Sequence, residues 1–326
     1  MNKYLILILI LLSVYGLRAQ QMPMFTQYMH NPYVLNPAAG GATINTEAML
    51  GYRNQWSGFE GAPKTFYFSM HGALGSVKQR TTRTGGSRQA RSLGSYQSVG
   101  GYIFTDKTGP ISHSGLYASY AYHLEIDAGV HVSMGAFIGG LQYTLDADEI
   151  RLANNSNDLD DALGTGRETQ FMPDISLGVY LHTEKYFVGI TARQILQNKF
   201  KFNDLLEDKY SKLVNHVYFT AGYNFYLDRT WTLQPSTLVK YSQPAEVQLD
   251  FNVKAIYNEL IWGGISYRTN ESVAGLLGMN IQESFSLGYS YDYGIKEIGT
   301  LHNGSHEIVL GYRFNQSPSR YKRRKR

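Results

Sequence analysis

The C-terminal half of the chain alternates apolar and polar residues with a period of two. Residues 247–257 read VQLDFNVKAIY, in which every second side chain is apolar and the positions between them include Asp250, Asn252 and Lys254. A strand with this pattern has one apolar and one polar face. Charges on the inner face of a soluble β-sandwich would be buried at a cost, whereas the lumen of a membrane barrel hydrates them, so the pattern predicts a transmembrane β-barrel. The same alternation recurs over residues 217–227, 285–294 and 305–314.

Counting every such segment gives fourteen predicted strands. An even number is what single-chain bacterial barrels contain. The predicted fold class is therefore an all-β, antiparallel barrel of the outer membrane with about 14 strands. The segments lie near residues 44–52, 65–74, 96–104, 113–124, 128–143, 174–182, 186–193, 216–227, 230–241, 246–257, 260–268, 272–281, 284–293 and 305–314.

The lengths of the connections give the predicted barrel an orientation. Periplasmic turns of outer-membrane barrels are short, and their extracellular loops are longer. With the N-terminus in the periplasm, all the connections on the periplasmic side are short except residues 75–95. The long connections on the outer side are residues 53–64, 145–173, 194–215 and 294–304.

The first residues predict export from the cytoplasm. Lys3, an apolar run over residues 4–15 and the small residue Ala19 are typical of a secretory signal peptide covering residues 1–19. The apolar run is too short to span a bilayer as a helix, and no later run is long enough. We therefore predict a periplasmic N-terminal segment over residues 20–43, the barrel over 44–314 and a basic periplasmic tail over 315–326.

The composition agrees with a membrane barrel. The chain of 326 residues contains 26 Tyr and 33 Gly, and 17% of its residues are charged. Barrels place amphipathic aromatic rings in girdles at the two membrane surfaces. The absence of Cys excludes disulfides, thiolate metal sites and a cysteine nucleophile.

Two segments on the predicted periplasmic side are strongly basic and contain no acid. They hold 11 of the 30 Lys and Arg residues, which leaves 19 against 26 acids elsewhere. One hypothesis is that they dock an acidic periplasmic partner by electrostatic steering, and the other is that they are simply solvated. Nucleic acid is not expected as a partner in this compartment. The candidate docking residues are Lys78, Arg80, Arg83, Arg88 and Arg91 in the first segment, and Arg323, Arg324 and Arg326 in the tail.

No pattern of catalytic or metal-binding residues stands out. The chain has no G-x-S-x-G, phosphate-binding loop or H-E-x-x-H motif. The acidic connection over residues 145–173 offers oxygen ligands for Ca²⁺, but it lacks the ordered spacing and final Glu of an EF-hand loop, which favours a solvated loop. We therefore expect no enzyme activity, no cofactor and no metal site.

The stretch over residues 25–65 is rich in residues that fix or free the backbone. Three prolines fix φ, and Asn31 and Asn36 each precede a proline, which favours turns. An ordinary turn-rich entry into the first strand is one interpretation. The other is a defined shape, because the phrases QYMHNPYVLNPAAGG and YRNQWSGFEGAPKT resemble the N-terminal signature of the PorP/SprF family of the type IX secretion system.

The resemblance extends over nearly the whole mature chain, with DISLGVYL, GYSYD and GSHEIVLGYRF as further family-like phrases. It implies a non-enzymatic barrel in the outer-membrane lipid that serves type IX secretion. PorP-like members act with the general machinery, including the periplasmic ring and a peptidoglycan-binding lipoprotein. SprF-like members assist export or surface attachment of one partner, often a large adhesin used in gliding. The long basic tail departs from the family pattern, and a passive channel for small or hydrophobic solutes is the alternative function.

The positions that match the signature are the candidate site residues. The Asn-Pro segment is expected to lie at or within the periplasmic mouth as a small plug, with its Asn side chains bonded to lumen groups. Residues 53–65 are expected to form a rigid outer loop, in which Trp56 and Phe59 anchor a partner. A place for Trp56 in the aromatic girdle is the alternative. Ala38, Gly40, Gly61 and Thr65 match as well, and the candidate site residues are Gln27, Tyr28, Asn31, Pro32, Asn36 and Pro37 in the first phrase, and Arg53, Asn54, Gln55, Trp56, Pro63 and Lys64 in the second.

Overall fold

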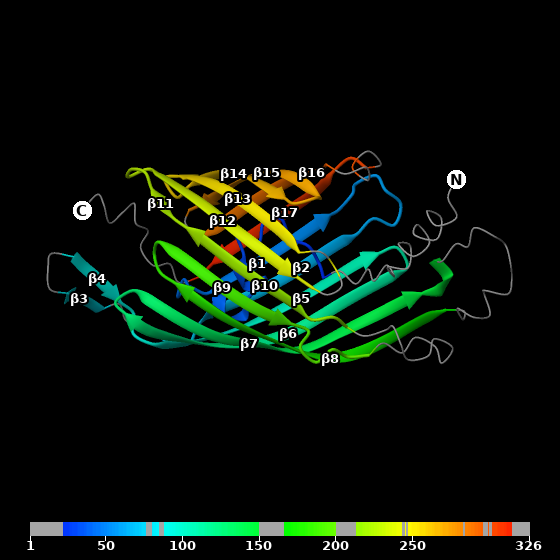
Figure 1. The fold of residues 1–326 in the computed structure, drawn as a ribbon, viewed down its shortest axis with the longest axis horizontal. Helices are drawn as coiled ribbons and strands as arrows, with labels where there is room; N and C mark the ends of the chain where they lie inside the picture. The colour runs from blue at the N-terminus through cyan, green and yellow to red at the C-terminus, as the bar shows by residue number, and fades with distance from the viewer. Residues whose placement is uncertain are drawn as a thin grey trace, which may run out of the picture.

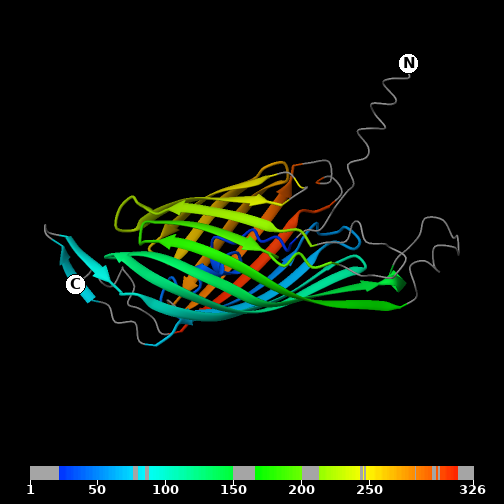
Figure 2. The same ribbon diagram turned by 60° about the horizontal axis from the view of Figure 1, so that its bottom comes forward.

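Antiparallel pairing joins fifteen strands into one sheet that closes on itself in the computed structural model (Figures 1 and 2). The structure describes residues 22–75, 80–84, 88–149, 166–199, 213–242, 245, 247–282, 284–295, 299 and 302–314. The strands of this sheet are β1 (Glu47–Asn54), β2 (Lys64–Ala73), β5 (Tyr96–Thr108), β6 (Ile111–Asp127), β7 (Val130–Asp146), β8 (Arg167–His182), β9 (Tyr186–Arg193), β10 (His216–Tyr223), β11 (Phe225–Tyr226), β12 (Trp231–Tyr241), β13 (Gln248–Tyr257), β14 (Ile261–Arg268), β15 (Ser272–Ile281), β16 (Phe285–Gly294) and β17 (Ser305–Arg313).

The first and last strands close the barrel by pairing with each other. Glu47 at the start of β1 lies opposite Arg313, and Asn54 at its end lies opposite His306. Strand β10 pairs with both β9 and β12, which completes the ring. The two-residue β11 continues β10 beyond Asn224, so the fifteen assigned strands form fourteen barrel strands. The predicted fold class and number of strands are confirmed.

The two ends of the barrel differ in the length of their connections. At one end, which we call the turn end, five connections of two to four residues join β6 to β7, β8 to β9, β11 to β12, β13 to β14 and β15 to β16. In the turn before β12, the pKa of the Asp228 carboxyl is lowered by hydrogen bonds from the Thr230 hydroxyl and from the backbone N–H groups of Thr230 and Trp231. The opposite end, the loop end, has connections of up to 22 residues. Since short turns face the periplasm in bacterial barrels, the loop end is predicted to face outward.

The long connection at the turn end contains a separate hairpin. Strands β3 (Arg80–Thr84) and β4 (Arg88–Ser92) pair only with each other and project beyond the barrel wall (Figures 1 and 2). The long connection predicted among the short turns is therefore present between β2 and β5, and part of it forms a two-stranded sheet.

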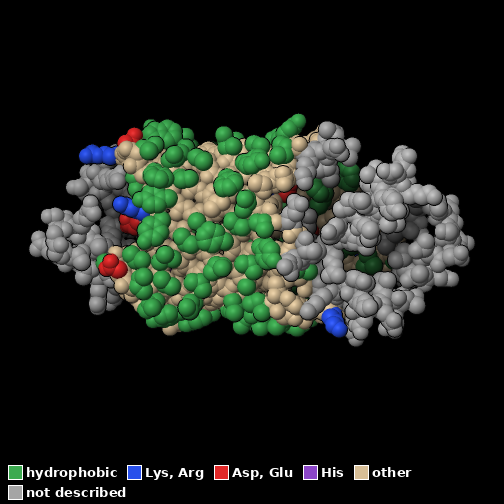
Figure 3. Space-filling view, in the orientation of Figure 1, with side chains coloured by type: hydrophobic (Ala, Val, Ile, Leu, Met, Phe, Trp, Pro, Cys, Tyr) green, Lys and Arg blue, Asp and Glu red, His purple; other side chains and the backbone are tan. Residues whose placement is uncertain are grey.

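The outer surface of the barrel is an apolar belt. Figure 3 shows hydrophobic side chains around the middle of the molecule, with charged side chains near the two edges of the belt. The alternation read from the sequence sets this surface: Phe251 and Val253 on β13 are about half exposed, whereas Asp250 and Asn252 between them are buried. A belt of this kind is what lipid contact requires. Separately, the helices among the described residues include none long and apolar enough to cross a membrane.

Candidate functional site

Residues 22–46 run through the interior of the barrel and lead into β1. We call them the lumen segment, which is dark blue among the strands in Figure 2. Its contacts follow the barrel axis in order. Thr26 is bonded to the loop-end parts of β16 and β17, Tyr33 to the middle of β6, and Gly41 to the turn-end parts of β2 and β5. The segment therefore extends along the lumen and is not confined to one mouth.

An ionic cluster at the loop end holds the start of the lumen segment. Arg53 on β1 is 2.8 Å from Asp292 on β16 and 3.2 Å from Glu307 on β17. The Thr26 hydroxyl donates to Asp292 at 2.6 Å, and its backbone N–H donates to Glu307 at 2.7 Å. Gln27 donates to the same glutamate from its backbone N–H and to the glutamate's main-chain carbonyl from its side-chain amide. Arg53 is 2% exposed and Glu307 is 0% exposed, so water does not solvate their charges. The two charges are compensated by each other and by the hydrogen bonds that the segment donates to Glu307.

A second ionic group continues this cluster around the wall. Arg268 on β14 lies directly opposite Asp250 on β13, and its Nε is 3.3 Å from each carboxylate oxygen. The Arg268 Nη1 atom also lies 3.1 Å from Glu271 and 3.9 Å from Asp292. The two ionic groups are therefore joined through Asp292, and they line one side of the lumen.

Two short 3-10 turns shape the middle of the lumen segment. They are η1 (Pro32–Val34) and η2 (Pro37–Ala39), and each begins with a proline. Proline suits the first position of such a turn, because its missing N–H would have no partner there. The Asn36 side chain caps η2 by accepting from the Ala38 backbone N–H at 2.9 Å. Each Asn-Pro pair of the sequence thus begins a 3-10 turn, and the asparagine of the second pair caps its turn.

The same Asn side chains tie the turns to the barrel wall. Asn31 Nδ2 donates to the Ser69 hydroxyl on β2 at 2.9 Å. Asn36 Nδ2 donates to the main-chain carbonyls of Val179 on β8 at 3.0 Å and Ile190 on β9 at 3.4 Å. The segment is consequently bonded to two separate parts of the wall. The neighbouring Tyr28 is also buried and accepts from Asn252 on β13.

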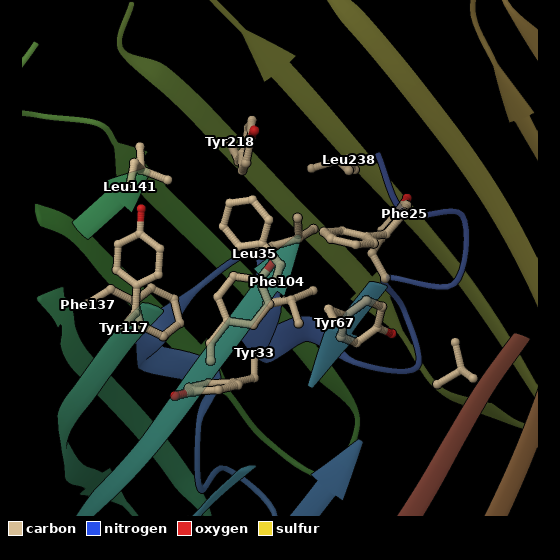
Figure 4. Close-up of a cluster of buried hydrophobic side chains, with 14 of the residues drawn as sticks. Phe25, Tyr33, Leu35, Tyr67, Phe104, Tyr117, Phe137, Leu141, Tyr218 and Leu238 are labelled. Carbon is tan, nitrogen blue, oxygen red and sulfur yellow. The ribbon is translucent and has the colours of Figure 1, made fainter. Parts of the chain in front are cut away.

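An aromatic cluster covers the other side of the lumen segment (Figure 4). The rings of Phe25 and Tyr67 meet edge to face with centroids 4.9 Å apart, and those of Tyr33 and Phe137 with centroids 5.1 Å apart. Such edge-to-face pairs are favourable beyond the area that they bury. The cluster gives the lumen an apolar half beside its ionic half. Figure 4 labels Phe25, Tyr33 and Leu35 from the segment, with Tyr67, Phe104, Tyr117, Phe137, Leu141, Tyr218 and Leu238 from the wall.

Hydrogen bonds at the turn end hold the final part of the lumen segment. The Gly41 N–H donates to His71 Nδ1 at 3.1 Å, and its carbonyl accepts from the Tyr96 hydroxyl at 3.2 Å. The Ser98 hydroxyl donates to the Gly40 carbonyl at 2.6 Å. Gly41 has a φ of 79°, a conformation that glycine adopts without strain, and an added Cβ would lie 2.5 Å from that of Ser98. The backbone of the lumen segment therefore packs directly against β5 at this end, with no room for a side chain at Gly41.

Two expectations about the lumen are corrected by this geometry. The segment was expected at or within the periplasmic mouth, with its Asn side chains bonded to lumen groups; it extends along the lumen to the loop end, because one of its sides packs on aromatic rings and the other bonds to the ionic cluster. The inward charges were expected to be hydrated. Instead Asp250, Arg268 and Glu307 are buried and paired, since the segment occupies the space that water would fill.

The second signature phrase is divided between the lumen and the loop end. Arg53 and Asn54 end β1 and Lys64 begins β2, so Arg53 belongs to the ionic cluster and not to the expected outer loop. Its side chain points inward because it alternates with the exposed Tyr52. The Gln55 N–H donates to the Pro63 carbonyl at 2.9 Å, which closes the remaining loop at its base.

Trp56 lies in this loop in a conformation rare for a side chain of its size, with a φ of 51°. Its backbone N–H donates to the Ser305 hydroxyl at 3.0 Å, and its ring stacks on that of His302 with centroids 6.1 Å apart. Phe59, three residues later, is 46% exposed. The loop therefore offers an aromatic surface that is fixed to the start of β17.

The candidate basic residues fall partly on the hairpin at the turn end. Arg80 and Arg83 lie on β3, and Arg88 and Arg91 lie on β4. Lys78 and the three arginines of the tail lie outside the described residues, as does most of the acidic connection considered for Ca²⁺. Among the described residues, no three His, Asp or Glu side chains converge so as to hold a metal ion.

Several residues that hold the lumen segment were not singled out from the sequence. Asp292 and Glu307 lie in segments whose alternation was recognised, but their common partner Arg53 was expected in an outer loop. Arg193 on β9 was also missed, although its Nη1 donates to the Val34 carbonyl of the segment at 2.9 Å. Inward positions of opposite charge are a usable signal only when the register between strands is known.

A closed antiparallel barrel of fourteen strands, with an apolar outer belt and an internal segment bonded to its wall, is an outer-membrane β-barrel. The chain belongs to the PorP/SprF family of type IX secretion system membrane proteins, whose family model matches residues 17–312. The family expected from the signature phrases is thus confirmed.

A comparison with solved structures finds chains to which this one is similar. The Pseudomonas putida toluene transporter TodX is 10% identical with a TM-score of 0.50, covering 88% of this chain and 94% of that chain. The Ralstonia pickettii toluene transporter TbuX is 11% identical with a TM-score of 0.46, covering 86% of this chain and 92% of that chain. At such identities the likeness to TodX concerns the barrel alone. A comparison with curated protein sequences finds no match.

Proposed function

We propose that this protein is a non-enzymatic partner in type IX secretion that supports export or surface attachment of cargo such as a large adhesin, with a lumen closed by its own N-terminal segment. The observation that carries this proposal is the occupied lumen. Hydrogen bonds hold the segment from Thr26 at the loop end to Gly41 at the turn end, and aromatic rings pack along its length. A barrel whose lumen is filled in this way offers binding surfaces to its partners and does not form an open channel.

The two ends of the barrel offer different partners. At the loop end, the aromatic surface formed by Trp56 and Phe59 is suited to an exported protein, because buried aromatic anchors dominate the energy of many interfaces. At the turn end, the arginines of β3 and β4 are suited to an acidic component of the periplasmic machinery, such as the ring or a peptidoglycan-binding lipoprotein. The barrel reaches these places after removal of residues 1–19 during export.

The test is quantitative proteomics of the cell surface and the medium, with and without this protein. Loss of one large surface protein, restored by re-expression of the barrel, is the result expected for a dedicated partner. Loss of every type IX cargo would instead assign the protein to the general machinery. Unchanged secretion of all cargo would overturn the proposal and leave the passive channel, which liposome permeability measures directly.

A further inference from the structure

The lumen segment enters the barrel from the loop end. Its first luminal hydrogen bonds, those of Thr26, are made to Asp292 and Glu307, each of which lies two residues from the loop-end terminus of its strand. Its last ones, at Gly40 and Gly41, are made to residues near the turn-end termini of β2 and β5. The lumen segment thus passes from the loop end to the turn end, through the thickness of the membrane, before β1 begins.

We infer that the start of the lumen segment, residues 22–24, lies at the cell-surface end of the barrel, on the opposite side of the membrane from the start of β1. Met24 is two residues from Thr26 and can lie at most about 7 Å from it. The apolar belt of an outer-membrane barrel is about 25 Å tall, so the chain cannot return to the periplasmic side within that length. This placement goes beyond the secretion role and does not depend on it.

The start of the segment is bonded to the closing seam of the barrel. Arg53 belongs to the first strand and Glu307 to the last, and Thr26 is bonded to both of them. Residues that join the seam therefore also hold the segment.

The placement also defines a surface at the loop end. The start of the segment lies beside β17, and Ser305 at the beginning of β17 fixes the Trp56 loop. An exported protein that binds this loop would therefore contact the chain that closes the lumen. The loop and the segment form one continuous surface toward the outside.

The absence of Cys in the chain allows a direct test by single-cysteine labelling in intact cells. Met24→Cys, at a half-buried position of the segment's start, is compared with Glu60→Cys in the exposed loop that follows β1 and with Lys185→Cys in the exposed turn between β8 and β9. Each full-length variant is treated with a membrane-impermeant maleimide before and after cell lysis. Heat-modifiable migration in gels shows that each barrel is folded.

The expected result is that Met24→Cys and Glu60→Cys are each labelled to the same extent in intact as in lysed cells, while Lys185→Cys is labelled only after lysis. Labelling of Met24→Cys only after lysis would place that position in the periplasm and overturn the inference. Labelling only after denaturation would also overturn it, because the position would then be enclosed. Reversed labelling of the two control positions would show that the sides of the barrel are exchanged, which equally contradicts it.

Discussion

Arg53 and Glu307 lie directly opposite each other across the seam between the first and last strands, and both are buried. The guanidinium donates to the carboxylate at 3.2 Å and to the hydroxyl of Thr26 at 2.7 Å. One arginine therefore joins three parts of the chain: the lumen segment, the first strand and the last strand. Such a residue couples closure of the barrel to occupation of the lumen.

Arg53→Ala is expected to destabilise the barrel strongly. Removing the guanidinium leaves Glu307 buried without an ionic partner and Asp292 with only the more distant Arg268, and breaking a buried ion pair in this way costs about 3–5 kcal/mol. The measurement is the urea dependence of unfolding in detergent, followed by gel migration. The matched control is Lys107→Ala, because Lys107 pairs with Glu149 on the exposed surface at 2.7 Å, and such pairs contribute less than about 1 kcal/mol. Equal losses for the two variants would contradict the role assigned to the cluster.

Deletion of residues 25–38 is expected to open the lumen. The deletion removes the bonds of Thr26 and Asn36 to the wall and the rings of Phe25 and Tyr33 from the aromatic cluster. Conductance in planar bilayers and uptake of large antibiotics should both rise above the values of the intact protein. Unchanged conductance, with the barrel assembled, would show that the segment does not close the passage.

A single substitution should displace the segment without shortening the chain. A Cβ added at Gly135 on β7 would lie 2.7 Å from the Ala38 backbone nitrogen and 2.9 Å from its Cα, so Gly135→Val forces η2 away from the wall. Gly275 on β15 has no atom within 4 Å of such a Cβ and serves as the control. Gly135→Val is expected to raise conductance, whereas Gly275→Val leaves it unchanged. The opposite order would contradict the packing described for the segment.

The two asparagines of the segment should respond differently to a change into aspartate. Asn36 donates to two main-chain carbonyls, which can only accept, so Asn36→Asp loses both bonds and sets a carboxylate against them. Asn31 donates to the hydroxyl of Ser69, which can reverse and donate to a carboxylate. Release of the segment should become easier by about 1–3 kcal/mol in Asn36→Asp and by less in Asn31→Asp. The extent of protease cleavage within the segment after equal times of digestion is measured for Asn36→Asp and for Asn31→Asp.

The fourteen strands could be predicted because their signal is local. Alternation along β13 or β16 depends only on which side of one strand meets lipid, and no knowledge of neighbouring strands is needed. The hairpin of β3 and β4 has a weaker local signal, since Gly85 and Gly86 lie between the run RTTRT, which contains three threonines, and the polar run RQARS. That signal was not used, and residues 75–95 were predicted only as a long basic connection.

The contents of the lumen could not be predicted, because the contacts there are between distant residues. Arg53 and Glu307 are 254 positions apart, and they meet only after all the strands between them have paired in register. The Asn-Pro pairs did indicate two turns, but their place in the barrel depends on the aromatic rings and carbonyls that surround them. The bond from Arg193 to the Val34 carbonyl leaves no trace in the sequence, since any residue has a carbonyl.

Trp56→Ala is expected to weaken attachment of an exported partner while leaving the barrel as stable as before. The variant keeps the backbone N–H that donates to Ser305 and loses only the ring that stacks on His302. A central aromatic anchor is worth about 2 kcal/mol or more, so the amount of partner retained at the cell surface should fall by roughly 30-fold at subsaturating levels. The control is Trp231→Ala at the turn end, where the indole packs on Tyr257 beside the lipid. If both variants retain the partner equally well, Trp56 belongs to the aromatic girdle and not to a binding surface.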